Sequence, residues 1–174
     1  MVYRIATLAE LEKVEDIRGN ITADAAELRA LADRLLILEV VSYNAEYQLT
    51  RDKRPDLYRL FGSFRADVVQ ECVVSLKPVK QKIQQRFDIL CGDAALLAGL
   101  EAEEKLNDAD DLADITPEGT IEIGELIIQH LGLALDPYPR AKDADFNEIL
   151  REAGLLQQDN QLAEQLAALQ KKPQ

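Results

Sequence analysis

The chain has 174 residues, 47% of them hydrophobic, which is enough to bury the core of one globular domain. Its 20 basic and 32 acidic residues give a formal net charge of −12, which argues against indiscriminate binding to nucleic acid or anionic lipid, because both attractions come from clustered lysine and arginine. Aromatic residues make up only 5% of the chain, so base-stacking platforms are not expected.

The first elements that the sequence predicts are an amphipathic helix and a strand. Asp24, followed three residues later by Glu27, has the form of a helix capping box. Apolar residues then recur at helical spacing, at Leu28, Leu31, Ala32 and Leu35. Over residues 41–49 apolar and polar side chains alternate, which indicates a strand with one buried face.

A second, longer alternating stretch follows at residues 58–76, after a polar turn at 51–55, and the two stretches predict a β-hairpin. The second arm is too long to stay straight, so we expect a bend or bulge near Gly62. Residues 79–91 fit both a strand and a helical stripe, and periodicity does not decide between them.

The charge of the C-terminal half is concentrated in residues 100–119, where eight acids face a single lysine. Because this stretch offers little apolar surface, we expect a flexible acidic loop. Residues 120–123 predict a short strand, and apolar residues from Leu126 to Ala134 predict a helix that Pro137 and Pro139 end. The tail at 159–174 predicts a loosely attached, short amphipathic helix.

Together these elements predict one α+β domain over residues 1–174. It has a mostly antiparallel sheet with a long hairpin, packed by a helix in the N-terminal half, a helix after the acidic loop and a short C-terminal helix. Charged residues near the N-terminus leave no room for the apolar segment of a signal peptide, and the longest apolar run is far shorter than a membrane span. We therefore expect a cytoplasmic protein with no membrane partner.

Residues with catalytic chemistry are few. The single histidine, His130, lies on the apolar stripe of a predicted helix, where a core or boundary role is expected. Cys72 and Cys91 fall on predicted apolar strand faces, where a thiol packs as a small hydrophobe and its pKa rises. No glycine-rich nucleotide motif and no complete calcium loop is present. We expect no enzymatic activity, cofactor or metal; a hydrolase using His130 or Cys72 is the remaining enzymatic alternative.

Residues 51–86 are net basic although the chain as a whole is acidic, because they contain nine bases and four acids. Several of the bases fall on the polar parity of the predicted strands, which makes them candidates for contact with RNA phosphates. Ordinary solvated sheet surface explains them about equally well. The candidates are Arg59, Arg65, Lys77, Lys80, Lys82 and Arg86.

Two stretches resemble a known family. Residues 62–79, GSFRADVVQECVVSLKPV, resemble the hallmark of the YceD family, bacterial and plastid proteins linked to accumulation of large-subunit ribosomal RNA. Residues 121–139, IEIGELIIQHLGLALDPYP, resemble the second block of that family, especially in its alphaproteobacterial branch. The positions that carry the resemblance are Gln70, Cys72, Leu76, Pro78, Val79, Gly124, Glu125, Leu131, Pro137 and Pro139.

The chain departs from the family pattern at a position where the resemblance would imply a zinc site. Many relatives carry Cys-x-x-Cys beginning at the position of Cys72, with a further cysteine downstream of the paired prolines. Here the second position is Ser75, and neither cysteine nor histidine follows His130. One thiolate does not hold a four-coordinate metal, so the zinc site is not expected in this chain.

The resemblance implies a non-enzymatic factor in ribosome biogenesis that supports the synthesis, processing or stability of large-subunit ribosomal RNA. On the leading hypothesis, the basic hairpin face contacts this RNA or a pre-ribosomal particle, and the acidic remainder prevents indiscriminate binding. The alternative is an acidic adaptor, in which residues 100–119 hold a basic ribosomal protein or assembly factor.

Overall fold

The structure is a computed structural model that describes residues 5–11, 16–102, 111–116 and 118–142, together with residues 144, 150, 151 and 154. It divides into two compact units. The first unit comprises Met1–Gln70 and Lys80–Pro137, and the second comprises Glu71–Val79 and Tyr138–Gln174.

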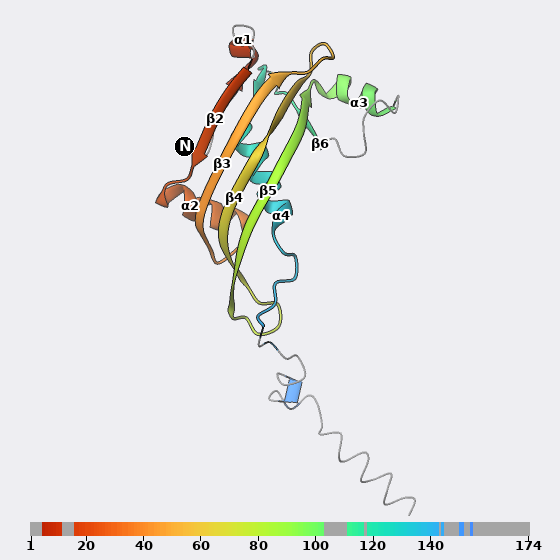
Figure 1. Cartoon of the computed structure of the whole chain (residues 1–174). Coiled ribbons are helices and arrows are strands. Elements are labelled where there is room, and N and C mark those ends of the chain that lie inside the picture. Colours follow the sequence, from red (N-terminus) through yellow and green to blue (C-terminus); the bar gives the residue numbers. More distant parts are fainter. Residues whose placement is uncertain are drawn as a thin grey trace, which may run out of the picture. The chain divides into compact units, whose positions relative to one another are not determined.

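The first unit is built on a five-stranded sheet in the order β2-β3-β4-β5-β6 (Figure 1). The strands are β2 (Asp16–Thr22), β3 (Glu39–Arg51), β4 (Tyr58–Glu71), β5 (Pro78–Gly92) and β6 (Asp111–Asp114). Strand β3 pairs antiparallel with both β2 and β4, whereas β6 runs parallel to β5. A separate antiparallel pair joins β1 (Ala6–Thr7) to β7 (Thr120–Ile121). The predicted α+β fold with a mostly antiparallel sheet is confirmed.

Four helices complete the described chain: α1 (Leu8–Leu11), α2 (Ala25–Leu35), α3 (Ala94–Ala102) and α4 (Ile123–Ala134). Helices α2 and α4 lie on one face of the sheet (Figure 1), and their apolar residues join those of β3, β4 and β5 in one core. Tyr43, Phe64, Leu31 and Leu131 are almost fully buried there. The opposite face of the sheet, which we call the open face, is not covered by these two helices. No helix of the described residues is long and apolar enough to span a membrane.

Helix α2 begins with the capping box that the sequence predicts. The Asp24 side chain accepts hydrogen bonds from the backbone N–H groups of Ala26 and Glu27, at 2.8 and 2.9 Å. The Glu27 carboxylate accepts in return from the Asp24 N–H at 3.0 Å. These bonds satisfy donors that the first turn of a helix leaves without partners, so a local sequence pattern suffices to place the start of the helix.

The hairpin forms as predicted, but its second arm differs in two respects. Strand β4 ends at Glu71 rather than continuing to residue 76, because the chain turns there: the Leu76 N–H donates to the Cys72 carbonyl, and Leu76 takes a φ of 57°. The predicted bulge near Gly62 is also wrong. Pairing continues without interruption past Gly62, and the register shifts instead between Val40 and Ser42 on the partner strand.

The structure resolves residues 79–91 as strand, within β5, and confirms a strand at 120–121 and a helix from 123 to 134. The predicted acidic loop is only partly a loop: α3 reaches Ala102, and β6 pairs with β5 and places Ala113 in the core. The remainder, residues 103–110 and 117, and the predicted tail helix at 159–174 lie outside the described residues.

Candidate nucleic-acid interface

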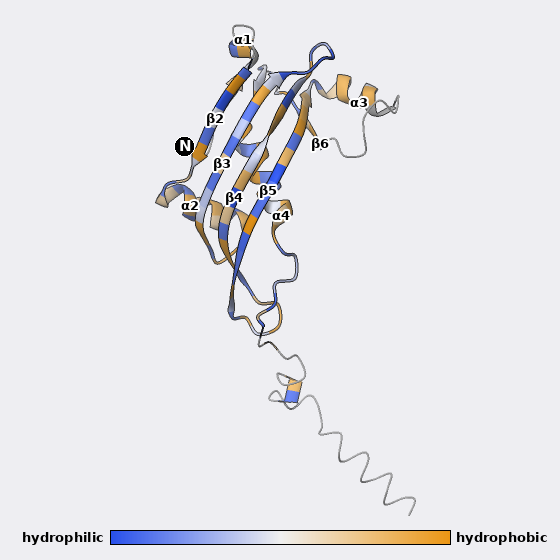
Figure 2. Ribbon diagram, viewed as in Figure 1, coloured by the Kyte–Doolittle hydropathy of each residue, from blue (hydrophilic) through white to orange (hydrophobic). Residues whose placement is uncertain are grey.

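The open face of the sheet consists of alternate residues of β2, β3, β4 and β5. Side chains of a strand alternate between faces, and bands of hydrophilic and hydrophobic character accordingly follow one another along the strands (Figure 2). Opposed residues of an antiparallel pair share a face. Arg18, Gln48 and Phe61 therefore form one row across the open face, and Asn20, Glu46 and Ser63 form the next.

Five of the six predicted RNA-contact residues lie on this face. Strand parity places Arg59 and Arg65 of β4 there, and the face also carries Lys80, Lys82 and Arg86 of β5. The sixth, Lys77, belongs to the second unit. The face also carries Arg18, which the sequence did not single out because β2 was not predicted.

The open face is mixed in charge rather than uniformly basic. Within the first unit its six bases share it with five acids, namely Asp16, Glu39, Glu46, Asp67 and Asp88. The basic residues therefore gather on one side of the sheet, while the local excess of positive charge is small. Binding of a polyanion here would depend on the bases that have no acidic neighbour.

Arg59 is held by acids of the same face. Its Nε lies 3.3 Å from Asp88 Oδ1 and 3.9 Å from Asp52 Oδ2. Asp52 also accepts from Arg54 Nε at 2.8 Å, and the hydrogen bond from Arg54 holds the pKa of Asp52 below its ordinary value. Arg59 thus pairs with an acid of the hairpin turn as well as with an acid of the open face.

The other bases on β4 and β5 differ from Arg59 in this respect. The side chains of Arg65, Lys80, Lys82 and Arg86 are exposed and make no ion pair with another residue in the described part of the chain. An exposed, unpaired cation can neutralise a phosphate without first losing an internal partner.

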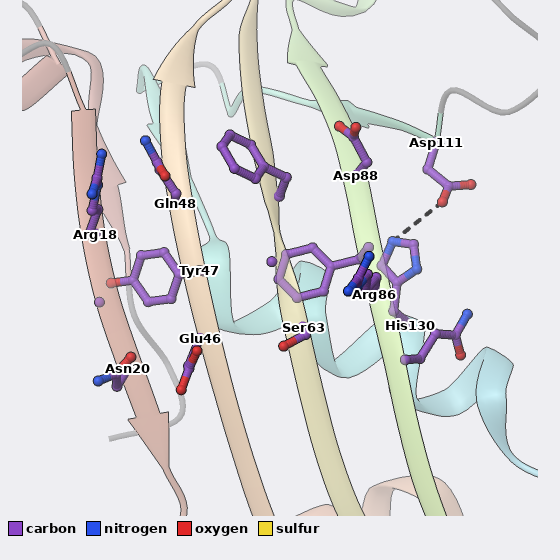
Figure 3. A pocket seen from close by; sticks show the side chains of 15 residues that line it. Arg18, Asn20, Glu46, Tyr47, Gln48, Ser63, Arg86, Asp88, Asp111 and His130 are labelled. Atoms are coloured by element: carbon purple, nitrogen blue, oxygen red, sulfur yellow. Dashed lines mark ion pairs between the residues drawn. The ribbon is translucent and has the colours of Figure 1, made fainter.

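A hollow of about 790 Å³ lies across the sheet, and it is lined by open-face residues of β2 to β5 together with Tyr47 and Phe87, whose side chains belong to the core. It extends from Arg18 and Asn20 on β2 to Asp111 and His130 beside β5 (Figure 3). Tyr47 separates the two rows of the open face along β3, but its side chain is buried on the core face, where Gly19 and Gly62 flank it on the neighbouring strands. Neither glycine has a side chain to compete with Tyr47 for space.

His130 occupies the boundary position that the sequence indicates. It is partly buried, its ring centroid lies 6.0 Å from that of Phe87, and its Nε2 lies 3.8 Å from Asp111 Oδ2. An aromatic ring and one partly exposed carboxylate are the surroundings of a histidine that closes the edge of a core.

The second unit holds a loop centred on Cys72, which sequence reasoning placed wrongly on a strand face. Cys72 Sγ accepts hydrogen bonds from the backbone N–H groups of Ala141 and Ser75, each at 3.3 Å. The Ala141 N–H first, and after it the side chain and N–H of Ser75, stabilise the thiolate and lower the pKa of Cys72 to about 6. The prediction of a raised pKa is therefore wrong for Cys72.

Cys91 behaves as predicted. It is 1% exposed within the core, and burial raises the pKa of its thiol to about 12. The two cysteines of the chain thus differ because one sulfur faces backbone donors and the other faces apolar side chains.

The Cys72 loop does not fit the zinc site that the resemblance would imply. The residue three positions on is Ser75, which is not a zinc ligand of such sites, and the Cys72 sulfur accepts hydrogen bonds from two backbone N–H groups. Among the described residues, no group of three or more His, Cys, Asp or Glu side chains could hold a metal ion. A single thiolate with two amide donors is a hydrogen-bonded turn rather than a tetrahedral ligand set.

The family-motif positions are explained by contacts between the two sequence blocks. In the first unit, Gln70 is buried and its Nε2 donates to the Asp136 carbonyl, beside Pro137, at 2.9 Å. In the second, the Val73 N–H donates to the Pro139 carbonyl at 2.9 Å.

The remaining motif positions have structural roles. Leu131 and Gly124 are buried on α4, and Pro78 and Val79 begin β5. Glu125 accepts from both guanidinium nitrogens of Arg34 and so ties α4 to α2. The motif thus encodes packing and turn geometry, and the open-face bases lie mostly outside it.

A comparison with known families covers both sequence blocks. Residues 60–171 match the family described as Large ribosomal RNA subunit accumulation protein YceD. Neither curated proteins nor solved structures gave a match. The matched segment covers well over half of the chain and contains both sequence blocks. The chain therefore belongs to the YceD family, and with it has the role in large-subunit ribosomal RNA accumulation that the family description states.

Proposed function

We propose that this chain is a non-enzymatic, cytoplasmic ribosome-biogenesis factor that contacts large-subunit ribosomal RNA, or a pre-ribosomal particle, through the open face of its five-stranded sheet. In doing so it supports the synthesis, processing or stability of that RNA. The observation that carries the proposal is the gathering of Arg65, Lys80, Lys82 and Arg86 on one uncovered face without internal ion pairs among the described residues.

The acids on the same face support a selective contact. Two of them, Asp16 and Asp88, already pair with Arg18 and Arg59, at 2.7 and 3.3 Å, and among the described residues none of the open-face acids forms an ion pair with Arg65, Lys80, Lys82 or Arg86. The net charge of −12 repels RNA from the rest of the surface. Binding is then confined to a short phosphate path over β4 and β5.

The proposal is tested by filter binding of a large-subunit ribosomal RNA fragment over a salt series. Each phosphate contact contributes about 0.7 to 0.9 to the slope of log affinity against log salt. Replacing Arg65, Lys80, Lys82 and Arg86 by Gln should therefore lower the slope by about three and weaken binding at low salt. Arg59 and Lys77 are left intact, because Arg59 pairs with Asp52 and Asp88, and Lys77 belongs to the second unit rather than to the open face.

A matched control removes four other exposed bases with the same change in net charge. Replacing Arg29, Lys53, Arg140 and Lys142 by Gln should leave the slope unchanged. An equal loss of affinity in both variants would mean that only net charge matters. Unaltered binding by the open-face variant would contradict the proposal.

The adaptor alternative is tested on the same protein with a basic ribosomal protein as ligand. Removing residues 101–118 outright would also remove β6, which pairs with β5 and buries Ala113. Replacing Glu103, Glu104, Asp108 and Asp110 by Gln or Asn avoids this. Loss of capture in that variant, with RNA binding intact, would favour the adaptor over the RNA-contact function.

A further inference from the structure

One aromatic side chain of the open face, that of Phe61, lines the hollow. The register of β4 with β3 sets Phe61 opposite Gln48, which is itself opposite Arg18. Phe61 is the only aromatic residue that strand parity places on the open face within the described chain. The sequence predicts no base-stacking platform because the aromatic content is low. A single aromatic side chain on the open face is nevertheless sufficient to stack one base.

A single apolar side chain on a protein surface is ordinary. What sets Phe61 apart is its surroundings, because the other open-face residues that line the hollow are polar or charged. Asn20, Glu46 and Ser63 form the adjoining row, and these side chains offer both donors and acceptors. Such groups, next to a ring, match the edge and the face of a nucleobase.

Arg86 supplies the charge for a phosphate. It lines the same hollow, is exposed and has no ion pair with another described residue. Arg18, in contrast, is bound to Asp16, which also accepts from Gln48 Nε2 at 2.9 Å. These bonds hold the β2 side of the hollow in place, while Arg86 on the β5 side has no ion pair within the described part of the chain.

The size of the hollow suits one nucleotide. Binding sites for small ligands occupy about 300 to 1,000 Å³, and this hollow measures about 790 Å³. Bases within an A-form duplex are stacked on one another and are not accessible to an aromatic side chain, whereas unpaired bases are.

We propose that this hollow binds one unpaired nucleotide of RNA, with its base stacked on Phe61 and its phosphate held by Arg86. The inference rests on the proposed RNA-contact function and adds to it a preference for single-stranded segments. Phe61 is the stacking residue, Arg86 is the phosphate ligand, and Asn20, Glu46 and Ser63 face the edge of the base.

The test uses the full chain and a single-stranded oligoribonucleotide with one central 2-aminopurine, whose fluorescence falls when it stacks on an aromatic ring. A hairpin duplex of the same composition serves as the second ligand. Phe61→Leu keeps an apolar side chain and removes the aromatic face, whereas Phe61→Tyr keeps the ring. Tyr138→Leu changes an exposed aromatic residue outside the hollow and is the control.

We expect the wild type to quench the fluorescence and to bind the single strand more tightly than the duplex. Phe61→Leu should weaken single-strand binding on the order of tenfold and abolish the quenching. Phe61→Tyr and Tyr138→Leu should retain both.

Two results would overturn the inference: quenching by Phe61→Leu as strong as that by the wild type, or an equal loss of affinity for single strand and duplex in Phe61→Leu. If the four-base variant loses RNA affinity while Phe61→Leu does not, the proposed function stands and the stacking site is wrong. If the wild type binds no RNA, both are wrong.

Discussion

Glycine at position 62 is required by how closely β3 and β4 approach each other. A Cβ atom there would lie 2.0 Å from the Glu46 carbonyl oxygen and 2.8 Å from Phe87 Cζ. The carbonyl belongs to the backbone of the paired strand, so it cannot move aside as a flexible side chain would.

We therefore predict that Gly62→Ala lowers the free energy of unfolding by about 1 to 3 kcal/mol, as overpacking of a core does. Gly99→Ala is the matched control, because Gly99 lies within α3 with no atom within 4 Å of the added methyl group. That change should be neutral or stabilise by up to about 1 kcal/mol. Urea denaturation of both variants measures the difference, and equal stabilities would contradict the packing at Gly62.

Cys72 gives the chain a dependence of stability on pH. Its pKa in the folded protein is about 6, below the ordinary value of 9.0. Between these values the unfolded chain binds more protons at this thiol than the folded chain does, so the free energy of unfolding rises with pH. The contribution is complete above the unfolded pKa and is lost as the pH falls through about 6.

We predict that the stability difference between the wild type and Cys72→Ser grows as the pH rises from about 6 to about 8 under reducing conditions. Cys91→Ala is the control: the pKa of Cys91 is raised to about 12, so its thiol stays protonated in both states over this range. The difference in free energy of unfolding between Cys91→Ala and the wild type should therefore be constant over this pH range. A flat profile for Cys72→Ser, measured by denaturant titration at each pH, would refute the hydrogen-bonded thiolate.

At the scale of elements, α2 depends on its capping box. Asp24→Ala removes the acceptor for two N–H groups of the first turn and should cost about 1 kcal/mol. Asp33→Ala, at an exposed site near the other end of the helix, should cost nothing, because an acid is unfavourable near a helix C-terminus. Thermal denaturation compares the two, and a lower melting temperature for Asp33→Ala would contradict the assignment of the cap.

Local patterns predicted those elements whose determinants lie within a few residues of one another. The capping box and the alternation of residues 41–49 correctly placed α2 and most of β3. Strand β2 was missed because it is short and contains only two β-branched apolar residues, so its formation depends on pairing with β3, 22 or more residues away. Strand β6 was missed for the same reason, since its partner β5 precedes it by about 20 residues.

Contacts between distant segments explain the Cys72 error. The alternation of apolar residues continues past Glu71, and from sequence alone it favours a longer strand. The chain turns because Val73 bonds to Pro139 and Cys72 Sγ bonds to Ala141, partners more than 60 residues away. Local residue spacing does not indicate these long-range hydrogen bonds, so the environment of the Cys72 thiol could not be predicted from the sequence.

For the candidate site, the alternation of residues along the strands was the only sequence feature that predicted which bases share a face. Five of the six bases that the sequence singled out share the open face, because period-two alternation is set by strand geometry. The hollow and the position of Phe61 within it were not predicted, since both depend on the order and register of β2 to β5.

For the whole molecule, the account predicts where RNA lies. The acidic surface and the helices α2 and α4 should be free of RNA, and the open face should be in contact with it.

Ultraviolet cross-linking of the full chain to large-subunit ribosomal RNA, followed by mass spectrometry of the peptides, tests this most directly. We predict cross-links in residues 59–67 and 80–88, with Phe61 and Arg86 among the sites. Cross-links confined to α2, α4 or residues 138–174, with none on the open face, would contradict the account.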